Sequence, residues 1–244
     1  GGACFGRRVC VCPAQPLAAL SQSRVPGEPT DREVLRSSYD EGVHYVDGAL
    51  GLLFDRLRGS GLWDEMLVVV TSDHGEEFLE HGGYGHESLH EEVLRVPLIV
   101  KWPRAQRAGL VTEAPSSGVD LTPTLLAATG LPTDDLPGRD LGAPPADRVL
   151  MAGTLERIVI ADGLKGFFGG KAADRLFDLN ADPGERVDLA AARPVDLQRL
   201  AALLDRERRA ALELNRRLGS VVGFEQVELS AAERERLRAF GYLE

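Results

Sequence analysis

Apolar side chains recur every three or four positions over residues 31 to 58, which is the spacing of one face of an α-helix. They are Leu35, Tyr39, Val43, Val46, Leu50, Leu53 and Leu57. Thr30 and Glu33 have the spacing of a capping box at the start of this segment, and Gly59 follows its end. The pattern therefore predicts one long amphipathic helix.

Two short apolar runs rich in β-branched residues follow, over Met66–Thr71 and Val96–Trp102. Such runs are typical of strands that are buried on both faces in a parallel sheet beneath helices. Asp120 is a candidate cap for a further helix that ends at Gly130. The order helix, strand, loop, strand, helix predicts an α/β fold with a partial parallel sheet flanked by helices.

The pattern changes after a Pro/Gly-rich segment at residues 132–145. Four short runs separated by glycine turns predict a small antiparallel sheet, over residues 149–151, 157–161, 165–168 and 175–178. A long helix is expected from Pro194, and a last capped helix over residues 230–238. We therefore expect an irregular leader at 1–29, an α/β region at 30–145, and a small antiparallel sheet with C-terminal helices at 146–244.

Composition narrows the classes of function. Lys and Arg number 28 against 38 Asp and Glu, which gives a formal net charge of −10. This balance argues against a nucleic-acid partner and against docking on anionic membranes, and no apolar run approaches the length of a transmembrane segment. The three cysteines, Cys4, Cys10 and Cys12, form no disulfide framework, which is compatible with the cytoplasm or the periplasm. Because the chain begins without methionine, we expect it to start inside a longer gene.

Candidate chemistry begins where the first apolar run ends. Asp73 and His74 follow that strand directly, and ligands of open α/β sheets bind at the carboxyl ends of strands. A carboxylate and an imidazole on one turn, which Gly75 permits, suit a divalent cation of the calcium, manganese or zinc type. The alternative is an ordinary turn in which Asp73 bonds nearby backbone N–H groups.

The Gly-rich loop that follows contains His81 and His86. A loop histidine near a cation can bind an anionic oxyester or protonate a leaving group, because its unperturbed pKa lies near neutrality. For each histidine alone, the alternative is a solvated loop side chain.

A series of motifs in one order resembles the C-terminal part of the sulfatase family, in the alkaline phosphatase superfamily. The resemblance covers about residues 30 to 243, and Arg238–Leu243 resembles the tail of many bacterial members. The main motifs are Tyr39-Asp40, Thr71–Glu77, His81-Gly82, Gly85-His86, Leu94–Pro103, Val119–Leu126, Gly138–Leu141, Leu176–Leu179 and Asp182–Glu185.

The resemblance implies roles for the candidate residues. Asp73 and His74 match the family's second pair of metal ligands, with calcium the first choice and manganese or zinc the alternatives. His86 matches a position that contacts the sulfate or phosphate oxygens, and His81 is a further candidate for the same pocket. The implied activity is metal-dependent hydrolysis of small-molecule or glycan sulfate esters. A phosphate ester or phosphonate hydrolase is the alternative, because Asp-His-Gly occurs across the superfamily.

Two family features are missing from the sequence. The Cys/Ser-x-Pro-x-Arg motif that supplies the nucleophile is absent, as is the Asp-Asp pair near the family's N-terminus that supplies the first metal ligands. Asp73 and His74 alone fall short of the six to eight ligands that calcium takes. We therefore expect this chain to be inactive by itself. The alternatives are a non-catalytic remnant and a subunit completed by another chain.

Overall fold

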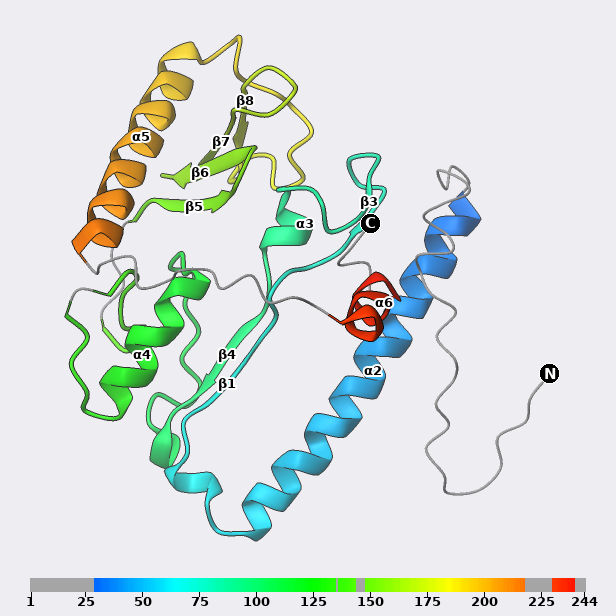
Figure 1. Ribbon diagram of the computed structural model, residues 1–244, viewed down its shortest axis with the longest axis vertical. Coiled ribbons are helices and arrows are strands. Elements are labelled where there is room, and N and C mark those ends of the chain that lie inside the picture. Colours follow the sequence, from blue (N-terminus) through cyan, green and yellow to red (C-terminus); the bar gives the residue numbers. More distant parts are fainter. Residues whose placement is uncertain (1–28, 135, 144–147, 218–229, 240–244) are drawn as a thin grey trace. The chain divides into compact units, whose positions relative to one another are not determined.

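The computed structural model describes residues 29–134, 136–143, 148–217 and 230–239 (Figure 1). Most of the expected leader, the end of the Pro/Gly-rich segment and the expected tail motif lie outside these residues. Contacts divide the chain into two units, one of residues 36–219 and one of both terminal stretches. The terminal unit contributes the start of helix α2 (Pro29–Gly59) and helix α6 (Ala231–Ala239). Every candidate site residue lies in the unit of residues 36–219.

Helix α2 confirms the long amphipathic helix that the apolar spacing predicts. Its apolar face is contacted at two points within residues 36–219. Tyr39 packs edge-on against Phe78 with ring centroids 5.4 Å apart, and Phe54 packs against Trp63 at 5.2 Å. Most of the helix between these contacts is exposed.

Strands β1 (Val68–Thr71) and β4 (Leu98–Lys101) confirm the two predicted strands, but they pair antiparallel, with Val69 opposite Val100. The parallel pairing expected from their continuous apolar runs is not found in any strand pair of the described residues. A parallel pair needs a crossover connection of a dozen or more residues, usually a helix. The connection here, residues 72–97, is long enough for a crossover but holds only a small hairpin and the four-residue helix α3 (Glu91–Leu94), and β4 runs antiparallel to β1.

The second half of the chain confirms the predicted antiparallel sheet, a meander of four strands in sequence order. Helix α5 (Pro194–Arg217) contributes Leu200 and Leu204 to a core shared with Val159, Leu164 and Leu176. The strands are β5 (Leu150–Gly153), β6 (Arg157–Ala161), β7 (Leu164–Phe168) and β8 (Arg175–Asp178). Strands and helices together confirm the α/β class.

Helix α4 (Leu121–Ala128) ends just before Gly130, as predicted. Asp120 before it is buried, where its side chain accepts hydrogen bonds from the Ser117 and Arg139 backbone N–H groups and pairs with Arg148. Burial alone would raise the pKa of this carboxyl, but the Arg148 guanidinium and the two N–H groups bring it below its usual range. Asp120 stands at the N-cap position of α4, as predicted, but its side chain makes no cap hydrogen bond to that helix and instead joins three other segments. The remaining short helices are η1 (Trp63–Glu65), η2 (Pro103–Ala105) and η3 (Gly118–Asp120).

Candidate functional site

The candidate site begins at a tight turn after strand β1. The Gly75 N–H donates to the Val93 carbonyl at the end of α3, with 2.7 Å between N and O. A Cβ atom at Gly75 would lie 2.1 Å from the Glu92 carbonyl oxygen. Glycine is therefore required here by close backbone approach, which fixes the turn against α3.

This turn brings the side chains of Asp73 and His74 toward each other. Asp73 Oδ2 lies 3.8 Å from His74 Nε2. The His74 Nδ1–H donates to the Gly75 carbonyl at 2.9 Å, which leaves the Nε2 lone pair free on the side of Asp73. The His74 backbone N–H donates to Asp73 Oδ1 and is the main reason that the pKa of this carboxyl lies below its ordinary value. Asp73 is thus ionised at neutral pH.

A hairpin then adds two further side chains. Strand β2 (Glu77–Phe78) pairs with β3 (Tyr84–Gly85), with Glu77 opposite Gly85. The next position outward in this register sets Glu76 opposite His86, and Glu76 Oε2 lies 3.3 Å from His86 Nδ1. The His86 ring also stacks on the His74 ring with centroids 4.1 Å apart.

Ligand atoms of His74, Glu76 and His86 all lie within 4.8 Å of one another. Two ligands at about 2.1–2.5 Å from one ion are about 3–4 Å apart when they occupy neighbouring positions. The Asp73–His74 separation matches that spacing. Imidazole nitrogens and carboxylate oxygens are also the donors that manganese and zinc prefer, and calcium takes the oxygens. The residues present therefore fit a divalent cation.

The structure places His81 apart from this cluster. Its ring stacks on His90 with centroids 3.6 Å apart, and its Nδ1 lies 2.7 Å from Glu92 Oε1. On the other side of the ring, Nε2 lies 3.1 Å from the Gly184 carbonyl oxygen. Of the two loop histidines predicted from the sequence, the hairpin thus brings His86 to His74, and His81 joins the loop to the segment after β8.

A buried charged network holds the far end of the same loop. Lys165 Nζ lies 2.9 Å from Glu91 Oε1 and 2.9 Å from Glu185 Oε1. Glu185 Oε2 accepts the Glu91 backbone N–H at 2.7 Å and lies 3.2 Å from His90 Nδ1. The Lys165 and Glu185 side chains are both wholly buried. The loop is thereby anchored on the C-terminal sheet.

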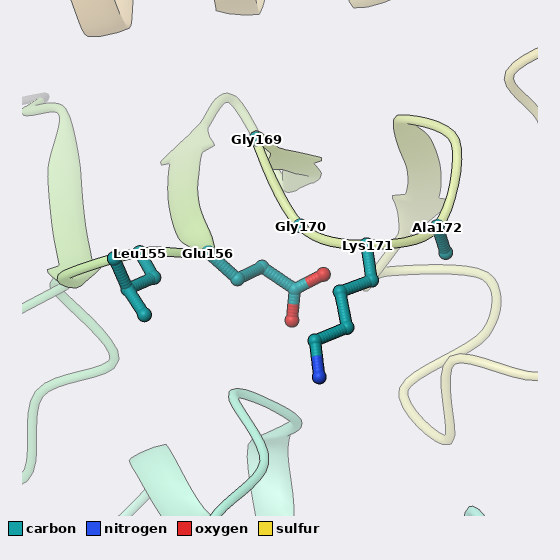
Figure 2. Close-up of a pocket in the computed structure, with 6 residues that line it drawn as sticks. All are labelled: Leu155, Glu156, Gly169, Gly170, Lys171 and Ala172. Atoms are coloured by element: carbon teal, nitrogen blue, oxygen red, sulfur yellow. The ribbon is translucent and has the colours of Figure 1, made fainter.

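An open depression of the C-terminal sheet lies between two of its turns (Figure 2). Glu156 and Lys171 extend toward the same space there, and Glu156 also pairs with Arg175 at 3.0 Å. The depression is lined by Leu155, Glu156, Gly169, Gly170, Lys171 and Ala172. None of these residues belongs to the cluster around His74.

Comparisons with known proteins agree on one family. Residues 14–131 match the family model described as Sulfatase. The chain is 31% identical to the choline-sulfatase of Rhizobium meliloti over 195 residues, which are 72% of this chain and 38% of that protein. The described helices contain no segment that is both long and apolar enough to cross a membrane.

Solved structures give the same result for the fold. One is a protein in complex with its substrate D-glucosamine-2-N,6-O-disulfate, with a TM-score of 0.58 and 25% identity over 68% of this chain and 39% of that one. Another is the phosphonate monoester hydrolase of Agrobacterium radiobacter, with a TM-score of 0.62 and 24% identity. That match covers 74% of this chain and 42% of the hydrolase. In all three comparisons the chain spans about two fifths of the relative's length.

Proposed function

Residues 14–131 of this chain belong to the sulfatase family, and on that premise we propose that the turn after β1 and its hairpin form the cation- and anion-binding loop of a sulfate ester hydrolase. The observation that carries the proposal is the approach of Asp73 to His74, which in turn clusters with Glu76 and His86 at the carboxyl end of β1. The first two are the residues that the sequence motif assigns to the metal.

Each side chain has a part in this proposal. Asp73 Oδ2 and His74 Nε2 hold a divalent cation, which when bound neutralises charge on the ester oxygens. Glu76 accepts a hydrogen bond from His86 Nδ1 and so fixes which nitrogen of His86 carries a proton. In its doubly protonated form His86 also carries a proton on Nε2, with which it would bind the sulfate oxygens or assist the leaving group. His81, which was the other candidate, instead orders the loop through His90 and Glu92.

The proposed substrate is a sulfate ester of a small molecule or glycan. Support comes from two relatives, one named a choline-sulfatase and one solved with a doubly sulfated glucosamine. The phosphonate monoester hydrolase resembles this chain in fold alone. Hydrolysis of phosphonates or phosphate esters is therefore only the second candidate activity.

Turnover needs a nucleophile as well as a cation. The 244 residues contain no Cys/Ser-x-Pro-x-Arg motif, so we propose that they do not hydrolyse sulfate esters unaided. The identity of the cation depends on how many of the four groups bind it. Calcium fits Asp73 and His74 with water completing the shell, whereas manganese or zinc fits a shell that also takes Glu76 or His86.

Calorimetric titration of the chain with calcium, manganese and zinc tests the cation site. Asp73→Ala should lower the affinity for the most tightly bound of the three cations by at least about tenfold, because it removes an ionised ligand. Glu87→Ala is the matched control, since Glu87 is an exposed carboxylate of the same loop and lies outside the cluster. Equal affinities in the chain and in Asp73→Ala would contradict the proposed cation site.

A second titration with inorganic sulfate in the presence of the bound cation tests the part of His86. His86→Ala should weaken sulfate binding by about tenfold while cation affinity changes less, because the proposed contact is with the anion. A larger loss of cation affinity would make His86 a metal ligand and would favour manganese or zinc. Unchanged affinity for both would contradict any part for His86 in the site.

A further inference from the structure

The open depression of the C-terminal sheet is formed by two neighbouring turns and takes no part in the proposed cation site (Figure 2). One turn joins β5 to β6, and the other joins β7 to β8. The depression has a volume of about 580 Å³, within the range of about 300–1,000 Å³ that small-molecule sites occupy. Because it is open rather than enclosed, it can hold one unit of a longer chain while the other units stay outside.

A fixed carboxylate and a free ammonium group face this depression. Arg175 holds Glu156 through an ion pair of 3.0 Å between Nη2 and Oε1. Gly170 packs so closely against the same carboxylate that a Cβ atom there would collide with Glu156 Oε1. Lys171 extends beside Glu156 into the same space, but it forms no ion pair with Glu156 or with any other described carboxylate (Figure 2). The depression therefore offers a hydrogen-bond acceptor in a fixed position and a cation that no described carboxylate neutralises.

These groups match the chemistry of an acidic sugar. Sugar hydroxyl groups donate to a carboxylate such as that of Glu156, and a sulfate or carboxylate on the same sugar pairs with Lys171. Leu155 beside them is 84% exposed, and it can cover the apolar C–H face of a sugar ring. Asp174, on the same turn as Lys171, already accepts the Gly169 backbone N–H at 3.4 Å. A polyanion without hydroxyl groups fits less well, because it would bring like charge to Glu156.

The depression neighbours the loop of the proposed cation site. Arg175 Cζ lies 4.2 Å from the centroid of the Phe167 ring, and Phe167 shares a hydrophobic core with Leu89 of that loop. The β5–β6 turn contacts the same leucine, because a Cβ atom at Gly153 would lie 2.7 Å from Leu89 Cδ1. Leu89 follows shortly after His86 in the sequence. A short segment of one loop thus joins the depression to the histidine that is proposed to bind sulfate.

We propose that the depression binds an acidic sugar unit of a glycan, next to the unit whose sulfate ester the cation site holds. Glu156 accepts hydrogen bonds from its hydroxyl groups, Lys171 pairs with its anionic group, and Leu155 packs on its ring. The substrate is then a glycan rather than a small sulfate ester. This last step rests on the proposed function, whereas binding of the sugar in the depression depends on neither the cation nor ester hydrolysis.

Calorimetric titration of the full chain in EDTA with a chondroitin 6-sulfate hexasaccharide tests the depression alone. A hyaluronan hexasaccharide, which carries carboxylates but no sulfate, shows in parallel which anionic group Lys171 binds. Lys171→Glu should lower the affinity for the more tightly bound oligosaccharide by at least about tenfold, because repulsion replaces attraction. Leu155→Ser should lower it by about threefold, because an apolar contact is lost. Both side chains are exposed, so the melting temperatures of the variants should match that of the unmodified chain.

Arg209→Glu is the matched control, because it makes the same change of charge at an exposed position of α5 outside the depression. It should bind the oligosaccharide as the unmodified chain does. The proposal is overturned if neither oligosaccharide binds, or if Lys171→Glu and Arg209→Glu bind equally well. Sodium tripolyphosphate, a polyanion without sugar hydroxyl groups, should bind at least about tenfold more weakly, and equal affinity would also overturn the proposal. Since EDTA removes divalent cations, failure of this test leaves the proposed cation site untouched.

Discussion

At Lys165, an ammonium group lies wholly inside the protein between the carboxylates of Glu91 and Glu185. A lysine inside an apolar strand would ordinarily be read as solvent-facing, and nothing near it in the sequence indicates otherwise. Its burial depends on Glu185, twenty residues further on, and on Glu91 at the start of α3. Contacts between residues this far apart in the sequence cannot be predicted from hydrophobic patterns, because these patterns report only local periodicity.

Lys165→Met should lower the free energy of unfolding by about 3–5 kcal/mol, because it leaves a buried carboxylate without its cation. Urea denaturation followed by circular dichroism measures this. Lys171→Met is the control, since Lys171 lies on an open turn of the same sheet, and it should change the free energy by less than about 0.5 kcal/mol. A loss below about 1 kcal/mol for Lys165→Met would mean that Glu185 is solvated or protonated in the folded protein.

The same network makes stability depend on pH through Glu185. Burial by itself would raise the pKa of this carboxyl, but its bonds to His90, Lys165 and the Glu91 N–H bring the pKa below its ordinary value. A carboxyl with a lowered folded pKa stabilises the fold above its unfolded pKa, about 4.3, and loses that contribution as pH falls through the folded pKa.

Urea titrations of the chain and of Glu185→Gln, made between pH 7 and pH 3, measure this effect. The stability difference between the two proteins should be largest at neutral pH and should shrink below about pH 4. Glu41→Gln, at an exposed position on α2, controls for general acid effects. A difference that stays constant over the whole range would contradict an ionised Glu185.

At the scale of elements, the sequence predicts helices well and strand pairing poorly. Helix α2 begins and ends close to its predicted positions, and α5 begins at Pro194 as predicted, because apolar spacing and glycine or proline punctuation are local signals. The antiparallel pairing of β1 with β4 is set by the connection between them, which apolar runs do not reveal. Glu76 is not among the site residues that the sequence predicts, because only the register of the β2–β3 hairpin sets it opposite His86.

The turn after β1 makes a prediction at this scale. Gly75→Ala should displace the turn from α3, because the added Cβ would lie 2.1 Å from the Glu92 carbonyl oxygen. We expect a loss of about 1–3 kcal/mol in the free energy of unfolding, and a weaker affinity for the divalent cation. Thermal unfolding and calorimetric titration measure the two effects.

Gly48→Ala is the matched control, because no atom lies within 4 Å of a Cβ at that exposed position of α2. It should raise the free energy of unfolding by about 0.5–1 kcal/mol, since alanine favours a helix over glycine. If Gly75→Ala behaved like Gly48→Ala, the close packing of the turn against α3 would be refuted.

At the scale of the whole molecule, the loop of the proposed cation site lies between two different supports. On one side are strands β1 and β4, whose edges are open in the described residues. On the other side is the C-terminal sheet, which anchors the loop through Lys165 and Glu185. The residues of this anchor all belong to this chain, and they hold the loop in place for the proposed cation site.

Anomalous X-ray diffraction from crystals of the chain soaked in manganese chloride tests the proposed cation site most directly. We expect one strong anomalous peak within about 2.0–2.6 Å of both Asp73 Oδ2 and His74 Nε2, with His86 beside it and the peak absent from crystals of Asp73→Ala. Manganese bound only elsewhere, or Asp73 and His74 directed away from each other, would contradict it.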